Sequence, residues 1–256
     1  MKIKTIQFSP TDGQKDKNLD KIKKIFLKQN FENVDLVVLP ELWSTGVYFE
    51  KFIELSEKIP GKTTKLLSDL ANQNNILLCG GSIVEKNNQN IYNTLTFFDR
   101  EGDLKEKYRK IHLFSYTNED QYLSPGKKTK TIETEFGKIG LSTCYDLRFP
   151  EQYRKMAQQG AQIFVCPAAW PEERKDHWKI FNQARAIENQ SYLISCNRRG
   201  KYDENNFIGN SYVIGPSGKI IKKETNKRIL TTNIDLKKIK ETRENFPTLK
   251  DYKKIT

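Results

Sequence analysis

A cysteine stands at the junction between a predicted strand and a predicted helix. Cys144 follows the strand-like run 138–143 and precedes a predicted helix over 150–159. A tight turn at such a junction lifts a nucleophile above the sheet and aims backbone N–H groups at the same point, so the Tyr145 amide is placed to hold an oxyanion. A buried, unreactive cysteine is the alternative that this position alone leaves open.

Two charged side chains also follow predicted strands. Glu41 comes directly after the apolar run 37–40, and Lys110 ends the strand-like segment 104–110. Ligands of α/β sheets bind beyond the carboxyl ends of the strands. A carboxylate there can take a thiol proton, and an ammonium can stabilise negative charge on a substrate oxygen. Taken singly, Glu41 is equally compatible with a plain surface position, and a solvated surface position is the default for Lys110.

The cysteine and histidine content narrows the possible mechanisms. The four cysteines are widely separated and lack CxxC spacing, and the only histidines are His112 and His177. This pattern disfavours a zinc site, a disulfide framework and a nucleophile that depends on an imidazole base. A nucleophile in this chain is therefore expected to use another base, and the other three cysteines receive no functional role.

Three short motifs surround the candidate residues. They are Leu-Pro-Glu-Leu at 39–42, Tyr-Arg-Lys-Ile-His-Leu-Phe at 108–114 and Cys-Tyr-Asp-Leu-Arg-Phe-Pro at 144–150, followed by Ala-Arg-Ala-Ile-Glu-Asn-Gln at 184–190. In this order, and along nearly its whole length, the chain resembles the nitrilase superfamily, the carbon-nitrogen hydrolases. The resemblance implies that Glu41, Lys110 and Cys144 act together as base, oxyanion stabiliser and nucleophile.

The resemblance has three further implications. It implies a second catalytic glutamate after the lysine strand, best matched by Glu119, which holds Lys110 and orients the substrate; the neighbouring Asp120 leaves this choice open. It implies an α/β fold, a four-layer-forming αββα sandwich of two mixed sheets flanked by helices, usually paired as a homodimer. It also implies a thioester on Cys144, with neither a metal nor an organic cofactor required.

Local matches point to one branch of the superfamily, the omega-amidases. These matches are the 144–150 motif, Ala-Trp-Pro at 169–171, and Asn-Gln-Ser-Tyr at 189–192 leading to Cys-Asn-Arg at 196–198. Omega-amidases hydrolyse the terminal amide of small 2-oxo acid amides, such as 2-oxoglutaramate and 2-oxosuccinamate, to the 2-oxo acid and ammonia. An N-carbamoyl amide hydrolase or an aliphatic amidase with the same three catalytic residues is the alternative.

The substrate of such an enzyme carries a carboxylate remote from the amide, which favours recognition by a fixed guanidinium with paired donors. Arg148, one turn beyond Cys144, is the candidate, and an ion pair with Asp146 or Glu151 is its alternative role. Four aromatic residues near the motifs are candidate walls of the substrate pocket, with core packing as the alternative: Trp43, Phe114, Tyr145 and Trp170.

Alternating strand and helix patterns position these residues. In the first half, strand-like runs at 3–8, 34–39, 76–84, 92–99 and 104–110 mix with helices around 19–26 and at 63–73. In the second half, strand-like runs at 138–143, 162–166, 192–196, 211–214 and 229–234 mix with helices at 150–159 and 173–189. The two halves share a rhythm of hairpins and crossover helices, which predicts two sheets covered by helices.

Length and charge set the remaining expectations. No linker divides the 256 residues, which indicates a single domain over 1–256, with 235–256 as a helix stopped by Pro247 and an extended tail. No signal segment or bilayer-length apolar run is found, so a cytoplasmic protein without a membrane partner is expected. The net charge of +12 raises the alternative of a basic nucleic-acid-binding protein, but the lysines are scattered among acidic residues, which favours a solvated surface and no nucleic-acid partner.

Overall fold

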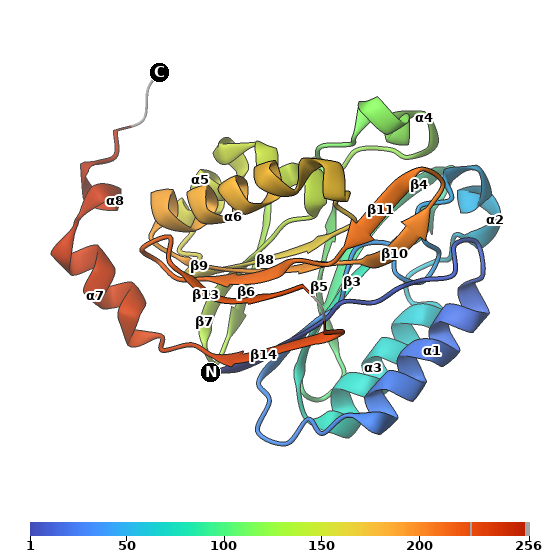
Figure 1. Cartoon of the computed structure of the whole chain (residues 1–256), viewed down its shortest axis with the longest axis horizontal. Helices are drawn as coiled ribbons and strands as arrows, with labels where there is room; N and C mark the ends of the chain where they lie inside the picture. The colour runs from blue at the N-terminus through green and yellow to red at the C-terminus, as the bar shows by residue number, and fades with distance from the viewer. Residues whose placement is uncertain (226, 254–256) are drawn as a thin grey trace.

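Two mixed six-stranded sheets organise the residues that the structure describes, 1–225 and 227–253 (Figure 1). In this computed structural model the first sheet has the strand order β14 (Ile229–Asn233), β1 (Lys2–Ile6), β2 (Leu36–Val38), β3 (Leu77–Asn87), β4 (Asn90–Phe98) and β5 (Leu104–Arg109). The second has the order β13 (Ile220–Glu224), β12 (Ser211–Ile214), β9 (Tyr192–Asn197), β8 (Ile163–Ala168), β7 (Gly137–Leu141) and β6 (Lys130–Thr134). A separate hairpin pairs β10 (Arg199–Tyr202) with β11 (Asn205–Ile208).

Each sheet has a parallel centre, because helices connect its inner strands. The crossover helices are α1 (Lys15–Lys28) and α3 (Lys62–Asn74) in the first sheet, and α5 (Pro150–Gln158) and α6 (Lys175–Asn189) in the second. They are amphipathic: in α1, four apolar residues recur at helical spacing on one face and are buried, namely Leu19, Ile22, Ile25 and Phe26. Among the described residues, no helix is long and apolar enough to cross a membrane.

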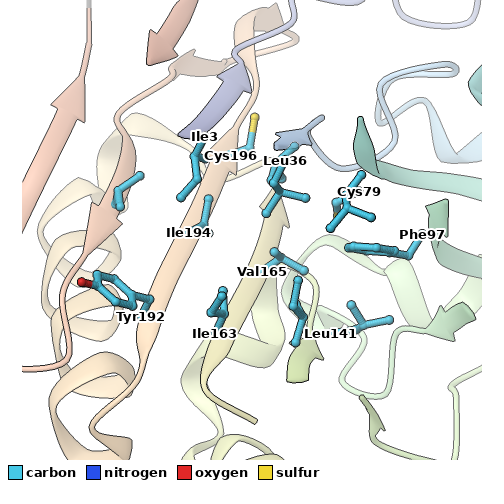
Figure 2. Packing of buried hydrophobic residues seen from close by; sticks show 14 of the residues in the cluster. Ile3, Leu36, Cys79, Phe97, Leu141, Ile163, Val165, Tyr192, Ile194 and Cys196 are labelled. Atoms are coloured by element: carbon cyan, nitrogen blue, oxygen red, sulfur yellow. The ribbon is translucent and has the colours of Figure 1, made fainter. Parts of the chain in front are cut away.

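The main apolar core lies between the two sheets. Figure 2 shows members of this cluster from both sheets, with Ile3, Leu36 and Cys79 from the first and Leu141, Val165 and Ile194 from the second. Separate clusters pack α1 and α3 on the first sheet, and α5 and α6 on the second, so the helices form the two outer layers in Figure 1. The αββα sandwich implied by the resemblance is therefore confirmed.

The strands absent from the sequence prediction are short and rich in polar residues. They are β6, β13 and the hairpin β10–β11; β6, for example, reads Lys-Thr-Ile-Glu-Thr, and its pairing with β7 rather than its own apolar content makes it a strand. The tail also differs from the sequence prediction. Beyond α7 (Lys237–Asn245), residues Thr248–Asp251 form the one-turn helix α8 in place of an extended end, and residues 254–256 of the predicted tail lie outside the described residues.

Candidate active site

One pocket of about 430 Å³ brings together all four predicted catalytic residues. Glu41, Lys110 and Cys144 follow β2, β5 and β7, and Glu119 begins the one-turn helix α4 (Glu119–Tyr122). The volume is in the range of small-molecule sites. Further lining residues come from loops and from the β10–β11 hairpin, including Val47, Phe49, Tyr116, Tyr202 and Phe207.

Cys144 occupies the kind of strand-to-helix turn that the sequence predicts. Its φ is +46°, in the left-handed region that residues with a side chain rarely adopt, and it begins the 3₁₀ turn Cys144–Arg148. Burial raises the pKa of the Cys144 thiol well above its usual range, and the charge of Glu41 raises it further, whereas Lys110 acts in the opposite direction. The resting thiol is thus protonated and needs a base before it can attack.

The ammonium of Lys110 is held between two carboxylates. Its Nζ lies 2.9 Å from Glu41 Oε1 and 3.0 and 2.8 Å from the two Glu119 oxygens, and all three side chains are buried. Burial alone lowers the pKa of Lys110, but the charges of Glu119 and Glu41 outweigh it and hold that pKa well above its usual range. Lys110 therefore stays charged. The neighbouring Asp120 is exposed, so it is Glu119 that lies against Lys110.

Both oxygens of the Glu41 carboxylate are fixed by hydrogen bonds. Besides Lys110, Oε1 accepts from the side-chain amide of Asn93 at 2.8 Å, and Oε2 accepts from the Ala169 backbone N–H at 2.9 Å. Asn93 also donates to Glu119 at 3.2 Å, so a single amide group bridges the two glutamates. The sequence prediction missed Asn93. The signal that could reveal it is an asparagine within a buried strand, where asparagine is disfavoured.

A further buried carboxylate joins the lysine motif to the cysteine turn. Asp146 Oδ2 accepts from Tyr108 Oη at 2.7 Å and from the Thr143 backbone N–H at 2.9 Å. Its Oδ1 lies 3.1 Å from the backbone N and 2.8 Å from Nδ1 of His112. Tyr108 and His112 belong to the lysine motif, whereas Thr143 precedes Cys144. Asp146 therefore fixes the lysine relative to the cysteine, a role that the sequence motif alone did not suggest.

Of the four residues predicted to form the pocket wall, Phe114 lines the pocket in the structure and the other three do not. Phe114 lines the pocket, and its ring centroid lies 4.7 Å from that of the partly buried Tyr145. Trp43 lies instead in the core between the first sheet and its helices, where its indole N–H donates to a β3 carbonyl at 2.7 Å. Trp170 is also buried, and its indole donates to the Arg174 carbonyl at 2.8 Å. Neither the two tryptophans nor Tyr145 is among the described residues that line the pocket.

The candidate carboxylate ligand, Arg148, lies beside the pocket rather than on its wall. Its guanidinium carbon is 4.9 Å from the centroid of the Trp170 ring, and its Nη2 is 3.3 Å from His177 Nδ1. Within the described residues, neither of the two acidic neighbours considered above forms an ion pair with it. Arg174, which the sequence did not single out, lines the pocket.

The polar groups of the pocket suit proton transfer better than metal binding. The oxygens of Glu41 and Glu119 face the Lys110 ammonium and N–H donors, and no group of His, Cys, Asp and Glu in the described ranges could hold a metal ion. A carboxylate beside a protonated thiol can accept its proton. The fixed ammonium next to it can stabilise the negative charge that a thiolate attack creates on a carbonyl oxygen.

Comparison with known sequences gives matches over nearly the whole chain. The model of the carbon-nitrogen hydrolase family matches residues 2–244. The 2-oxoglutaramate amidase of Bacillus subtilis (strain 168) is 35% identical over 253 residues, which cover 98% of this chain and 97% of the relative. The omega-amidase NIT2 of Mus musculus is 36% identical over 247 residues, which cover 92% of this chain and 89% of the relative.

Solved structures give the same result. Nit3 of Saccharomyces cerevisiae, a member of branch 10 of the nitrilase superfamily, has a TM-score of 0.87 at 32% identity, with 96% of this chain and 94% of that chain covered. XC1258 of Xanthomonas campestris, a CN-hydrolase superfamily protein with an arsenic adduct in its active site, has a TM-score of 0.94 at 26% identity, with 100% and 98% covered. The chain therefore belongs to the carbon-nitrogen hydrolase family of the nitrilase superfamily.

Proposed function

We propose that this enzyme hydrolyses the terminal amide of small 2-oxo acid amides, such as 2-oxoglutaramate and 2-oxosuccinamate, to the 2-oxo acid and ammonia. The observation that carries the proposal is the buried ammonium of Lys110, clamped by Glu41 and Glu119 in the pocket that Cys144 lines. The similarity to a 2-oxoglutaramate amidase and to omega-amidases supports this class of substrate.

In the first half-reaction Glu41 accepts the proton of the Cys144 thiol, and the thiolate forms a bond to the amide carbon. Lys110 and the Tyr145 backbone N–H hold the resulting oxyanion. When the C–N bond breaks, Glu41 returns the proton to the leaving nitrogen, which departs as ammonia. A thioester between the acyl group and Cys144 remains.

In the second half-reaction Glu41 acts as a base again. It takes a proton from water, the hydroxyl adds to the thioester carbon, and Lys110 holds the second oxyanion. The C–S bond then breaks, the 2-oxo acid leaves, and the Cys144 sulfur regains a proton from Glu41. Because Glu41 is fixed at 2.9 Å from Lys110 and at 2.9 Å from the Ala169 N–H, one carboxylate can serve both steps without moving.

The substrate class can be tested by measuring ammonia release by the wild-type enzyme from 2-oxoglutaramate, glutamine, asparagine, pentanamide and an N-carbamoyl amino acid. We expect the highest kcat/KM with the 2-oxo acid amide. Preferred turnover of the N-carbamoyl amino acid, with release of carbon dioxide, would assign the enzyme to the carbamoyl hydrolases. Preferred turnover of pentanamide would assign it to the aliphatic amidases.

We also propose that the enzyme is a homodimer in the cytoplasm. Ile180 and Ile187 of α6 are 59% and 53% exposed, and Phe246 after α7 is 70% exposed, so apolar area is available on the outer helix layer and the tail. Sedimentation equilibrium of the wild type and of Ile187→Glu tests the dimer: we expect the variant to be monomeric, and a monomeric wild type would refute the proposed dimer.

The proposed location is supported by the cysteines. All four are free thiols, which fits a reducing compartment such as the cytoplasm.

A further inference from the structure

We propose that Arg174 binds the substrate carboxylate that lies remote from the scissile amide, and so makes the enzyme select acidic amides over uncharged ones. The inference rests on the proposed function, because only a substrate with such a carboxylate needs this group. It assigns the role to a residue at the end of the 3₁₀ turn Glu172–Arg174, which follows β8.

The charges on the pocket wall are the first argument. Among the described residues that line the pocket, Lys110 and Arg174 are the cations. Lys110 is paired with Glu41 and Glu119 at 2.9 and 2.8 Å, so its charge is already balanced. Arg174 forms no ion pair with any carboxylate of the described ranges. Its guanidinium is therefore available to pair with the carboxylate of a bound substrate.

The support around Arg174 is the second argument. Its guanidinium carbon lies 4.8 Å from the ring centroid of Tyr116 and 5.5 Å from that of Phe114, and its backbone carbonyl accepts from the Trp170 indole at 2.8 Å. Ring contacts of this kind hold a guanidinium through its face and leave its N–H edge free for a carboxylate. Arg174 is partly buried, which strengthens a charge-assisted hydrogen bond relative to one in bulk water.

Arg174 is also linked to the catalytic lysine. The backbone N–H of Phe114, one of the two rings under the guanidinium, donates to Glu119 Oε2 at 2.7 Å. The same oxygen lies 2.8 Å from Lys110 Nζ. The carboxylate that holds the catalytic ammonium thus also holds the segment that supports Arg174, so the two cations are placed relative to each other through Glu119.

Acidic residues at the pocket do not remove this charge. Glu50, Glu173 and Asp203 line the pocket as well, but all three are exposed, so water and salt screen their charges.

Arg148 is the competing candidate for binding the substrate carboxylate, and its surroundings differ from those of Arg174. Its guanidinium lies among the rings of Trp170 and Phe181, 4.9 and 5.1 Å from their centroids, and it does not line the pocket.

The test compares kcat and KM for 2-oxoglutaramate and for pentanamide, an uncharged amide with the same number of carbons. The variants are Arg174→Gln, Arg174→Lys and Arg148→Gln. The matched control is Arg228→Gln, an exposed arginine between β13 and β14 that lies outside the pocket. Thermal melting of each full-length variant confirms that it is folded.

We expect Arg174→Gln to raise KM for 2-oxoglutaramate by roughly 10- to 100-fold, the loss of one charge-assisted pair, with kcat and the pentanamide kinetics almost unchanged. Arg174→Lys should recover part of the affinity, and Arg228→Gln should behave as the wild type. Equal losses on both amides, which would indicate a structural role, would overturn the proposal. Selective loss in Arg148→Gln alone would overturn it as well.

The substrates that the wild-type enzyme hydrolyses distinguish a failure of this inference from a failure of the proposed function. If the wild type hydrolyses an N-carbamoyl amino acid but not 2-oxoglutaramate, the proposed function fails. The Arg174 variants are then measured on the N-carbamoyl amino acid, which also carries a carboxylate, and a selective rise in KM would still support the inference. If the wild type hydrolyses only uncharged amides, both proposals fail.

Discussion

Both carboxylate oxygens of Glu119 lie within hydrogen-bonding distance of the Lys110 ammonium, at 3.0 and 2.8 Å. The charge of Glu119 is also the largest of the effects that keep the pKa of Lys110 raised against the opposing effect of burial. Glu119 therefore sets both the position and the charge of the group that is proposed to hold the oxyanion.

We expect Glu119→Gln to lower kcat by roughly 10- to 1,000-fold with a smaller change in KM, because the lysine acts mainly in the transition state. Steady-state ammonia release measures both constants. Asp120→Asn is the matched control, since this exposed neighbour lies away from Lys110 and should keep activity within about twofold. If Asp120→Asn rather than Glu119→Gln were impaired, the assignment of the second glutamate would be wrong.

Replacing Asp146 by asparagine should weaken both the fold and the site. Asp146 receives contacts from Tyr108 Oη, the Thr143 N–H and two nitrogens of His112, and an asparagine side chain offers only one oxygen as acceptor. Buried donors left without a partner cost about 1–3 kcal/mol each, so we expect the free energy of unfolding to fall by about 2–4 kcal/mol.

Urea denaturation of Asp146→Asn measures that loss, and kcat measured well below the denaturation midpoint reports the site. Tyr108→Phe removes one of the donors to Asp146 and also leaves the Ile111 backbone N–H and the Gln152 side-chain amide without their acceptor, so it should show a comparable loss of stability. Wild-type stability together with a wild-type kcat in Asp146→Asn would show that this carboxylate does not fix the lysine motif relative to the cysteine turn.

The four cysteines should differ sharply in their reactivity. Burial raises the pKa values of the Cys79 and Cys166 thiols to about 12, and that of Cys196 still further, and all three side chains are fully buried. Cys144 lines the pocket together with Glu41, the proposed base. Native protein should therefore be alkylated by iodoacetamide at Cys144 alone.

Peptide mass spectrometry locates the alkylated residues, and protein unfolded in guanidinium gives the labelling of all four thiols. Cys144→Ala should remain unlabelled in the native state. Rapid native labelling of a core cysteine before Cys144 would show that the pocket around Cys144 is closed to small electrophiles, contrary to its proposed use.

Glu85 should make the fold sensitive to acid. Burial alone raises the pKa of Glu85, but hydrogen bonds from Arg109, Thr94 and Lys107 outweigh it and lower the pKa from its usual 4.5 to about 2. Because the folded-state pKa is depressed, the contribution is fully present above about pH 4.5 and is lost as the pH falls toward 2.

We expect Glu85→Gln to cost about 2 kcal/mol of unfolding free energy at pH 7, allowing for the partial exposure of the two basic partners. The difference from the wild type should shrink as the pH falls from 4.5 toward 2. Urea denaturation at several pH values measures it. Glu133→Gln serves as the control because its carboxylate is 74% exposed. If the difference in unfolding free energy between the wild type and Glu85→Gln were the same at every pH, the proposed link between the ionisation of Glu85 and stability would be contradicted.

The meeting of Glu41, Lys110 and Cys144 in one pocket could be predicted because each follows a strand within a short motif. Glu41, Lys110 and Cys144 are read from local sequence, and the ends of β2, β5 and β7 then bring them to one pocket. Their supports could not be predicted in this way. Asn93 lies in the interior of β4, and its contact with Glu41 depends on the pairing of strands distant in sequence.

Side-chain direction limited the prediction of the pocket wall. Trp43 follows Glu41 closely, but the chain turns at Leu42, whose φ is +49°, and the indole enters the core. Arg174 lies in the charged run 172–176, where sequence offers no means to distinguish a pocket residue from a solvated one. The β10–β11 hairpin lacks an apolar pattern, because one face meets the pocket instead of the core.

The most direct test of the proposed mechanism is the rate of ammonia release from 2-oxoglutaramate by Cys144→Ala, compared with the wild type at equal protein concentration. Because this substitution removes the nucleophile, we expect a loss of at least about 10⁴-fold, with an unchanged thermal melting temperature. A folded Cys144→Ala that releases ammonia within about tenfold of the wild-type rate would show that no thioester on this residue is needed, and would contradict the mechanism.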